Sequence, residues 1–379
     1  MRSVAFDIRH VRSTRDAALC PLATNLYNSP SWLRFQEIER AGVSSSYFLA
    51  ATSDGAIVAA LPMYRVSAES NPNYLLPRVF PAAMADDGPQ VLIGNRHGYH
   101  NTLLTHPALP TRDRQVALAQ LVDAALEFVR RAGVRTAWWP FLDLAGMRAL
   151  RPLVGEAVPV AMKNECALRL TGTGFGDYLG QLSASRRRNV RVERARFAAA
   201  GYDTHGRRLS ESVDDVARLG VETVRKHGGS LDVETARRMT SAQAELLDDT
   251  SIVLTCGRQD RAVGMALIMD HGGTTYLRAA GFDYARAGNA AEYFELAFYR
   301  PIERAYSLGL AEVSLGVSSY RAKTTRGALL RTRWALPLRV PAWPDAVARK
   351  HNLAHLQAYE QELGTLRRAI PYADYDEYC

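Results

Sequence analysis

Apolar and polar residues in the first half of the chain form the patterns of a β-hairpin, a long helix and a strand. Two apolar runs within residues 46–66 flank Ser53-Asp54-Gly55, a turn that tolerates positive φ, and predict paired strands. Residues 112–133 carry apolar side chains at helical spacing up to Gly133, which predicts an amphipathic helix. The run VRTAWWPFL then predicts a strand. This half is therefore expected to be an α/β unit.

The second half repeats this order of elements. Three apolar runs between residues 251 and 282 predict strands, residues 289–308 predict a helix closed by Gly309, and AEVSLG predicts another strand. Two more helices are predicted before them, at about residues 183–200 and 212–228. Hairpin, helix and strand thus occur in both halves without a visible sequence repeat, which predicts two copies of one α/β unit.

The junction between these units is marked by the strand-like ECALRL and the Gly/Thr-rich TGTGFG. We expect an N-terminal domain over residues 1–168, a C-terminal domain over 169–342, and a final helix with an acidic tail over 343–379. A chain of 379 residues, 47% of them hydrophobic, is long enough for two cores.

The net charge is +8, yet it says little about a partner. Lys and Arg together number 47, and only Lys163, Lys226, Lys323 and Lys350 are lysines. Such an Ala/Arg-rich, Lys-poor composition is typical of a GC-rich genome, so the excess of positive charge is weak support for a polyanionic ligand.

Several classes of protein are disfavoured by what the sequence lacks. It has no P-loop, no G-x-S-x-G, no H-E-x-x-H and no Rossmann glycine motif after a strand. Its four cysteines are scattered, so neither a metal site nor a disulfide framework is indicated. The N-terminus lacks the apolar core of a signal peptide, and no apolar run approaches the roughly 18 residues of a membrane span. We expect a cytoplasmic protein that is not integral to a membrane.

Residues 275–334 carry a set of motifs in a specific order. An aromatic strand end is followed by Tyr-x-x-x-x-x-Tyr-x-x-Ile, by GL-x-x-V-x-x-G and by Tyr-x-x-Lys-x-x-x-Gly. This order resembles the second domain of the FemAB-like transferases, which are relatives of the Gcn5-type N-acetyltransferase (GNAT) superfamily. LSASRRRNVRVERARF upstream resembles the basic helix that opens that domain, and NSPSWLRFQEI and GYHNTLLTHP resemble parts of the first domain. The resemblance implies an α/β fold of tandem GNAT-like domains with mixed central sheets.

The resemblance also implies an acyl donor. FemAB-like enzymes move an amino acid from aminoacyl-tRNA to an amine, with the tRNA as co-substrate and no bound cofactor. Ordinary GNAT enzymes instead hold coenzyme A on a Q/R-x-x-G-x-G/A loop. Here Arg286, Gly288 and Ala290 are spaced R-x-G-x-A, one residue short, which weakens an acyl-CoA-dependent N-acyltransferase without excluding it. A non-catalytic module that binds RNA or a cell-wall precursor is the other alternative.

Lys323 is the first candidate for catalysis. It is one of four lysines, and it occupies the position of the family lysine that stabilises negative charge on the ester carbonyl, whereas a chance surface lysine is the alternative. Tyr320, on the same loop, is expected to orient the ester, and Glu292 or Asp283 to accept a proton. No covalent acyl-enzyme is expected, because no Ser-His-Asp or Cys-His set can be proposed.

The remaining candidates bind the substrates, and packing or a solvated helix face is the alternative for each of them. For tRNA phosphates we expect two basic clusters, Arg186, Arg187 and Arg191 on the helix at 183–200, and Arg321, Arg326 and Arg331 within and just after the last motif. For the acceptor and the ester we expect Arg278, Tyr276 and Tyr293 in the second domain, and Tyr99, His100 and Asn101 in the first. The partners implied are aminoacyl-tRNA and a small-molecule or peptide acceptor, and the protein is a monomer or homodimer.

The family acts on peptidoglycan cross-bridges or on peptide and nucleoside antibiotics. We favour natural-product tailoring, because no inserted coiled-coil arm is recognised between the helix at 212–228 and the strand at Ser251.

Overall fold

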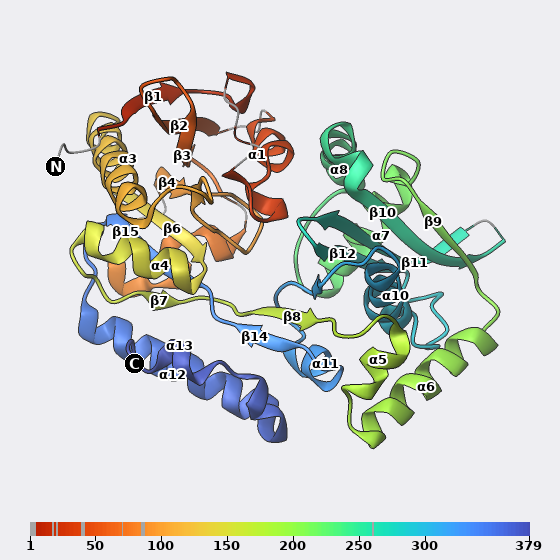
Figure 1. Ribbon diagram of the computed structural model, residues 1–379. Helices are drawn as coiled ribbons and strands as arrows, with labels where there is room; N and C mark the ends of the chain where they lie inside the picture. Colours follow the sequence, from red (N-terminus) through yellow and green to blue (C-terminus); the bar gives the residue numbers. More distant parts are fainter. Residues whose placement is uncertain are drawn as a thin grey trace. The chain divides into compact units, whose positions relative to one another are not determined.

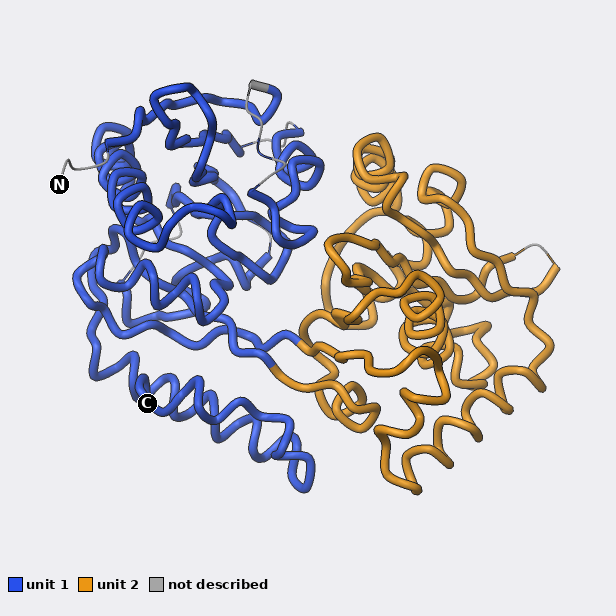
Figure 2. The backbone as a smooth tube through the Cα atoms, in the orientation of Figure 1, with its two compact units in different colours: residues 1–165, 331–379 blue, residues 166–330 orange. Residues whose placement is uncertain are grey.

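The computed structural model describes residues 5–16, 19, 22–38, 42–69, 71–84, 88–259 and 261–379. The chain forms two compact units, one of residues 1–165 with 331–379 and one of residues 166–330 (Figure 2). The expected second domain ran to residue 342, so its last stretch belongs instead to the first unit. Residues 343–379, expected as a separate helix and tail, also belong there.

The first unit is built on an eight-stranded sheet in the order β1-β2-β3-β4-β6-β15-β7, with β5 paired to β3 (Figure 1). Its strands are β1 (Asp7–Val11), β2 (Val43–Ala51), β3 (Ile57–Val66), β4 (Gln90–Ile93), β5 (Leu104–Thr105), β6 (Thr136–Leu142), β7 (Val160–Ala161) and β15 (Trp334–Arg339). β4 and β6 are parallel, whereas β2 and β3 form the predicted antiparallel hairpin.

The helices of this unit cover the sheet with apolar stripes. They are α1 (Pro30–Glu37), α2 (Leu76–Val79), α3 (Thr111–Arg131), α4 (Leu144–Leu150), α12 (Asp345–Leu363) and α13 (Tyr372–Tyr375). α3 is the helix predicted at 112–133, and it buries Leu118, Leu121 and Ala125 against β2 and β3. Helical spacing places these side chains on one face, which fixes the helix on the sheet.

The end of the chain returns to the first sheet. β15 pairs antiparallel with both β6 and β7, and α12 packs beside β7. The buried Asn352 fixes this contact, because its amide accepts from the N–H of Ala161 at 2.8 Å and donates to the carbonyl of Pro159 at 2.9 Å. An apolar strand pattern alone does not say which sheet a strand joins, and that is why the boundary at 342 was misplaced.

The second unit is built on a seven-stranded sheet in the order β14-β8-β13-β12-β11-β10-β9. Its strands are β8 (Glu165–Arg169), β9 (Asp203–Arg207), β10 (Ser251–Arg258), β11 (Arg261–His271), β12 (Thr274–Phe282), β13 (Glu312–Ser314) and β14 (Leu329–Arg331). β12 and β13 are parallel, and β10, β11 and β12 are antiparallel neighbours, so this sheet is also mixed.

Helices cover both faces of the second sheet. They are α5 (Phe175–Gly180), α6 (Ala184–Ala199), α7 (Val213–Lys226), α8 (Val233–Leu247), α9 (Glu292–Phe294), the π-helical turn η8 (Glu295–Tyr299), α10 (Arg300–Ser307) and α11 (Tyr320–Thr325). α9, η8 and α10 follow one another directly. On the face of the sheet that η8 covers, Leu296 of η8 and Phe197 of α6 share an apolar cluster with Ile268 of β11. On the other face Gly220 of α7 lies beside Met265.

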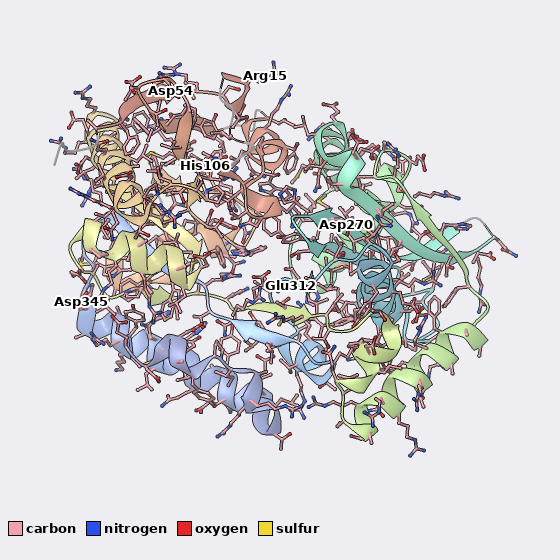
Figure 3. All side chains as sticks on the ribbon, in the orientation of Figure 1. Arg15, Asp54, His106, Asp270, Glu312 and Asp345 are labelled. Carbon is pink, nitrogen blue, oxygen red and sulfur yellow. The ribbon has the colours of Figure 1, made fainter. Side chains whose placement is uncertain are left out.

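Two features fix these helices in place. Asp270, labelled in Figure 3, accepts from Arg304 at 2.8 Å and from Thr275 at 2.7 Å, so it joins the end of β11 to α10 and β12. α8, which the sequence did not predict, packs on α7 through Ala236. Its outer face is polar, so it gave a weak apolar pattern.

Candidate active site and substrate-binding residues

The second sheet changes its pairing where β12 and β13 meet. The parallel pairing runs from Thr274 to Tyr276 on β12, and among the described residues β12 then continues to Phe282 along β11 alone. Leu277 pairs with Ile268 while Ala279 pairs with Leu267, so Arg278 is the extra residue of a β-bulge. The bulge bends β12 at this point and positions Tyr276, which is buried, and the half-buried Arg278 beside it.

Lys323 lies beside this change in pairing. Its side chain is 3% exposed, and its ammonium donates to the carbonyls of Val317 at 2.8 Å and Gly316 at 3.3 Å. A Cβ added to Gly316 would lie 3.8 Å from the carbonyl oxygen of Leu277, so the loop that holds the lysine runs next to the bulge. Lys323 therefore does not extend into bulk water.

The loop between β13 and α11 is conformationally strained. Ser318 and Ser319 have φ of 68° and 51°, values that non-glycine residues rarely adopt. Strain of this kind costs about 1–3 kcal/mol per residue and concentrates at functional sites. The carbonyls of Gly316 and Val317 in this turn both accept from the ammonium of Lys323, so the loop holds the cation with backbone oxygens.

Two predicted tyrosines border the same loop. Tyr320 follows Ser319 directly and is 8% exposed at the start of α11. Tyr293 packs against Phe282 and Phe298, and burial raises the pKa of its phenol, whereas a hydrogen bond with Ser319 opposes this rise in pKa. The phenol of Tyr293 therefore remains a protonated donor at neutral pH. The structure thus brings Lys323, Tyr320 and Tyr293 to one loop.

Glu292 is placed differently from expectation. It is 5% exposed, and its carboxylate accepts from the N–H of Gly288 at 2.7 Å, the N–H of Ala290 at 2.8 Å and the phenol of Tyr202 at 2.7 Å. Both oxygens already accept from these donors and hold the loop before α9, so this geometry does not support the expected role as proton acceptor. The alternative, Asp283, accepts from Arg286 at 3.1 Å.

Arg326 is also a correction. It was expected to bind donor phosphates, yet it is 7% exposed and its guanidinium donates to Glu193 at 2.6 Å and to the phenol of Tyr299 at 3.0 Å. The guanidinium carbon lies 3.3 Å from the ring centroid of Phe294. All these contacts are internal, so Arg326 joins α11, which carries Lys323, to α6 and to the π-helical turn.

The arginines of α6 divide into two groups. Arg187 donates to the carbonyl of Leu182 at 2.6 Å, and Arg194 pairs with Glu303 at 2.6 Å and with Glu295 at 3.3 Å. These contacts pack the helix on its own unit. The outer face carries exposed arginines at positions 188, 191 and 196, with Arg186 half-buried at the start.

Only part of the predicted phosphate-binding set is therefore on the surface. Arg191 and Arg321 are exposed, and Arg331 is half-buried at the end of β14. Arg188 and Arg196 were not singled out from the sequence. The signal that could have found them is their spacing around the exposed Val192, four residues from each on one helix face.

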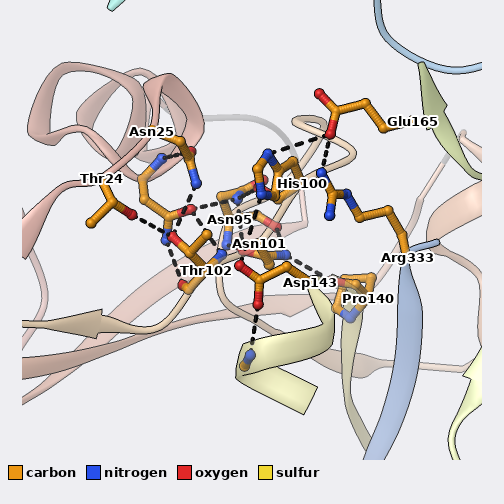
Figure 4. A network of polar contacts seen from close by, with 12 residues as sticks. Thr24, Asn25, Asn95, His100, Asn101, Thr102, Pro140, Asp143, Glu165 and Arg333 are labelled. Atoms are coloured by element: carbon orange, nitrogen blue, oxygen red, sulfur yellow. Dashed lines mark hydrogen bonds and ion pairs between the residues drawn. The ribbon is translucent and has the colours of Figure 1, made fainter. Parts of the chain in front are cut away.

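In the first unit, the loop that carries Tyr99, His100 and Asn101 is locked by hydrogen bonds (Figure 4). Asn101 is 1% exposed, accepts from the amide of Asn95 at 2.6 Å and donates to the carbonyl of Pro140 at 2.8 Å. Tyr99 has φ of 56° and accepts from Asn71 at 2.9 Å. Asn101 holds the loop, so it does not serve as an acceptor ligand as expected.

His100 is different, because its ring lies between carboxyl groups (Figure 4). Its Nδ1 is 3.6 Å from Glu165 and its Nε2 is 4.0 Å from Asp143, while Glu165 forms a close ion pair with Arg333. Burial and the charge of Arg333 lower the pKa of His100 to about 3, so the imidazole is neutral at physiological pH. A neutral imidazole here can accept a hydrogen bond from an N–H or O–H group.

Asp143 and Glu165 were not identified as site residues from the sequence, and Arg333 stood out only as part of the basic run at residues 321–339. Burial raises the pKa of Asp143, whose carboxylate also accepts from the N–H of Gly146 at 2.6 Å at the start of α4. The three residues come from distant parts of the chain, and no local motif joins them. Across the described ranges, no group of three His, Cys, Asp or Glu side chains could hold a metal ion.

Each unit thus has a mixed β-sheet covered by helices. In the second unit the bulged strand β12 stops pairing with its parallel neighbour β13 after Tyr276. This architecture is the tandem GNAT-like fold, as predicted. The chain belongs to the FemAB-like family, described as peptidoglycan biosynthesis/recognition, whose pattern matches residues 37–374. The membership indicates an acyltransferase.

Solved structures agree with this fold. FemX has a TM-score of 0.59 at 11% identity, over 87% of this chain and 96% of that chain. A conserved protein of unknown function from Bacteroides thetaiotaomicron VPI-5482 has a TM-score of 0.54 at 11% identity, over 89% and 100%. A tandem GNAT protein from the clavulanic acid biosynthesis pathway has a TM-score of 0.50 at 10% identity, over 88% and 98%. A search of curated protein sequences returned no match.

Among the helices described, none is both long and apolar enough to cross a membrane.

Proposed function

We propose that this acyltransferase moves an amino acid from aminoacyl-tRNA to an amine of a small-molecule or peptide acceptor. The observation that carries the proposal is the buried Lys323 ammonium, held by the carbonyls of Gly316 and Val317 beside the bulge in β12. A cation fixed in a water-poor place can stabilise the negative charge that develops on an ester carbonyl during acyl transfer.

The chemistry is a direct transfer. The acceptor nitrogen attacks the ester carbonyl carbon, a C–N bond forms, and the C–O bond to the terminal ribose of the tRNA breaks. The proton lost by the nitrogen is balanced by the proton gained by the departing ribose oxygen. Lys323 stabilises the intermediate oxyanion, and Tyr320, at the start of the same helix, orients the ester.

The donor is held by positive side chains on the surface of the second unit. α6 exposes Arg188, Arg191 and Arg196, and α11 exposes Arg321. The internal ion pair of Arg326 with Glu193 joins α11 to α6, so these arginines belong to connected elements. Guanidinium groups in such a set neutralise backbone phosphates, and the binding they give weakens steeply with salt.

The acceptor is proposed to be a natural-product intermediate. Residues between α6 and β10 form β9, α7 and α8, and α7 packs on β11 and β12, so this part of the chain covers its own sheet. Its two helices, α7 and α8, also pack on each other. The neutral His100 in the first unit is suited to accept a hydrogen bond from the acceptor.

The donor is tested by offering tRNA charged with labelled amino acids and labelled acetyl-CoA in parallel, with a panel of amine acceptors. We expect label transfer from charged tRNA that ribonuclease abolishes, and none from acetyl-CoA. Transfer only from acetyl-CoA would establish the alternative N-acyltransferase. Tight RNA binding that survives Lys323→Ala and Tyr320→Phe, with no turnover in any variant, would instead favour a binding module.

A further inference from the structure

The loop between β12 and α9 contains a small anion-binding turn that the chain fills itself. The N–H groups of Gly288 and Ala290 both point at the carboxylate of Glu292, at 2.7 and 2.8 Å, and each reaches a different oxygen. The phenol of Tyr202 donates to the oxygen that Gly288 also contacts, at 2.7 Å. The carboxylate therefore has three donors around it.

The backbone of this loop is strained in the way that makes N–H groups converge. Asn289 and Ala291 have φ of 54° and 69°. When left-handed residues alternate with ordinary ones, successive N–H groups turn to the same side and form a concave nest, the arrangement that binds phosphate groups in many proteins. Positive φ at two non-glycine residues destabilises the loop, and the hydrogen bonds that its N–H groups donate to an anion offset this strain.

The anion in this nest is part of the protein. Glu292 is 5% exposed, and Tyr202, which closes the nest, has the guanidinium of Arg258 5.1 Å from its ring centroid. Burial raises the pKa of the nearby Cys256 to about 12, and the negative charge of Glu292 adds to this effect. A diphosphate brought to the same place would meet satisfied N–H donors and a like charge, and both are unfavourable.

We infer that Glu292 is a specificity residue that fills the anion nest at residues 288–290 and so excludes acyl donors that carry a diphosphate. Acyl-CoA thioesters are the donors excluded, whereas a donor held by surface arginines is not affected. The inference rests on the proposed acyl transfer, since exclusion has a consequence only if the second unit binds an acyl donor.

The test removes the internal anion and measures ligand binding, with no need for turnover. Wild type, Glu292→Ala and the volume-conserving Glu292→Gln are titrated with inorganic diphosphate and with CoA by calorimetry, and their Tm is measured with and without diphosphate. Tyr202→Phe is the matched control, because it removes only the hydrogen bonds of the phenol with Glu292 and with the N–H of Gly288 and leaves the carboxylate in the nest.

We expect diphosphate to bind Glu292→Ala at least about tenfold more tightly than wild type and to raise its Tm, because the vacated N–H groups then gain a partner. Glu292→Gln should gain less, and Tyr202→Phe should behave as wild type. The inference is overturned if wild type binds CoA as tightly as Glu292→Ala, or if diphosphate changes neither Glu292 variant. A gain in diphosphate binding together with no transfer from charged tRNA would leave the inference intact and refute the proposed function.

Discussion

The loops that follow the two parallel strands β12 and β13 of the second sheet each bind a charged side chain with backbone groups, and the two charges have opposite sign. After β12, backbone N–H groups surround the carboxylate of Glu292, and after β13, backbone carbonyls surround the ammonium of Lys323. Each loop has two non-glycine residues at positive φ, and each is filled by a side chain from the helix that follows it.

The difference between the loops lies in what a bound donor would meet. A negative charge in a nest of N–H groups closes an anion site, because its donors are already used. A positive charge held by two backbone carbonyls can stabilise an oxyanion that forms next to it. On the proposals made above, the second unit pairs one loop that excludes a diphosphate with one that stabilises a developing alkoxide.

The largest effect should come from removing the ammonium. Lys323→Met deletes the charge but keeps a long apolar side chain, so we expect kcat for transfer to fall by about 10²–10³-fold with little change in KM. The readout is single-turnover transfer from charged tRNA. Lys350→Met is the control, because Lys350 is exposed on α12. If Lys323→Met transferred at the wild-type rate, the comparison between the loops would lose its catalytic half.

The contacts by which Arg326 joins α11 to α6 should have the next largest effect. Arg326→Met leaves Glu193 without its ion pair and removes the contact with the ring of Phe294, so we expect a loss of about 3 kcal/mol in the free energy of unfolding. Urea denaturation measures it. Arg188→Met, on the exposed face of α6, should change that free energy by less than about 0.5 kcal/mol. Equal losses in the free energy of unfolding of the two variants would mean that the contacts of Arg326 do not stabilise the second unit.

The hairpin, helix and strand shared by the two units were predictable, because amphipathic helices and apolar strands have distinct periods, whereas α8 and the sheet that β15 joins were not. Lys323 was singled out by its rarity and by the motif around it, and its catalytic role stays a prediction. Arg326 was not, because the sequence presents it in the same basic run as Arg321, and its partner Glu193 is far away along the chain. The nest around Glu292 depends on φ values and on Tyr202, which no local pattern specifies.

The first unit extends the comparison to a buried group kept neutral. The pKa of His100 is about 3 in the folded chain, by burial and then by the charge of Arg333, and 6.5 unfolded. Because folding favours the neutral ring, its contribution is complete above pH 6.5 and is lost as the pH falls toward 3. As the pH falls from above 6.5 to about 5, we expect protonation of His100 alone to lower the free energy of unfolding by about 2 kcal/mol.

Urea unfolding at several pH values checks this slope. His355, whose pKa is also lowered to about 3 by burial and then by His351, adds a second contribution of the same sign. His100→Gln should therefore reduce the pH dependence without removing it. An unchanged slope in this variant would show that the ring of His100 is not held neutral by the fold.

A smaller effect is expected on the surface of α6. Replacing the exposed pair Arg188 and Arg191 with Gln should weaken tRNA binding and reduce the slope of log K against log salt by about 1.5, since each phosphate contact contributes about 0.7–0.9. Arg238→Gln, on the exposed side of α8, is the matched control. A slope that the double variant shares with wild type would place the tRNA elsewhere.

The smallest effect separates the strain of the two loops. Ser318 and Asn289 are both exposed and have φ of 68° and 54°. Ser318→Gly should raise the free energy of unfolding by about 0.5 kcal/mol, whereas Asn289→Gly should leave it within about 0.3, because Asn tolerates positive φ better than Ser. If the strain at Ser318 also serves to aim the carbonyls at Lys323, Ser318→Gly gains stability and loses transfer rate, and Asn289→Gly changes neither. A stabilised Ser318→Gly variant with the wild-type rate would mean that the strain only closes the turn.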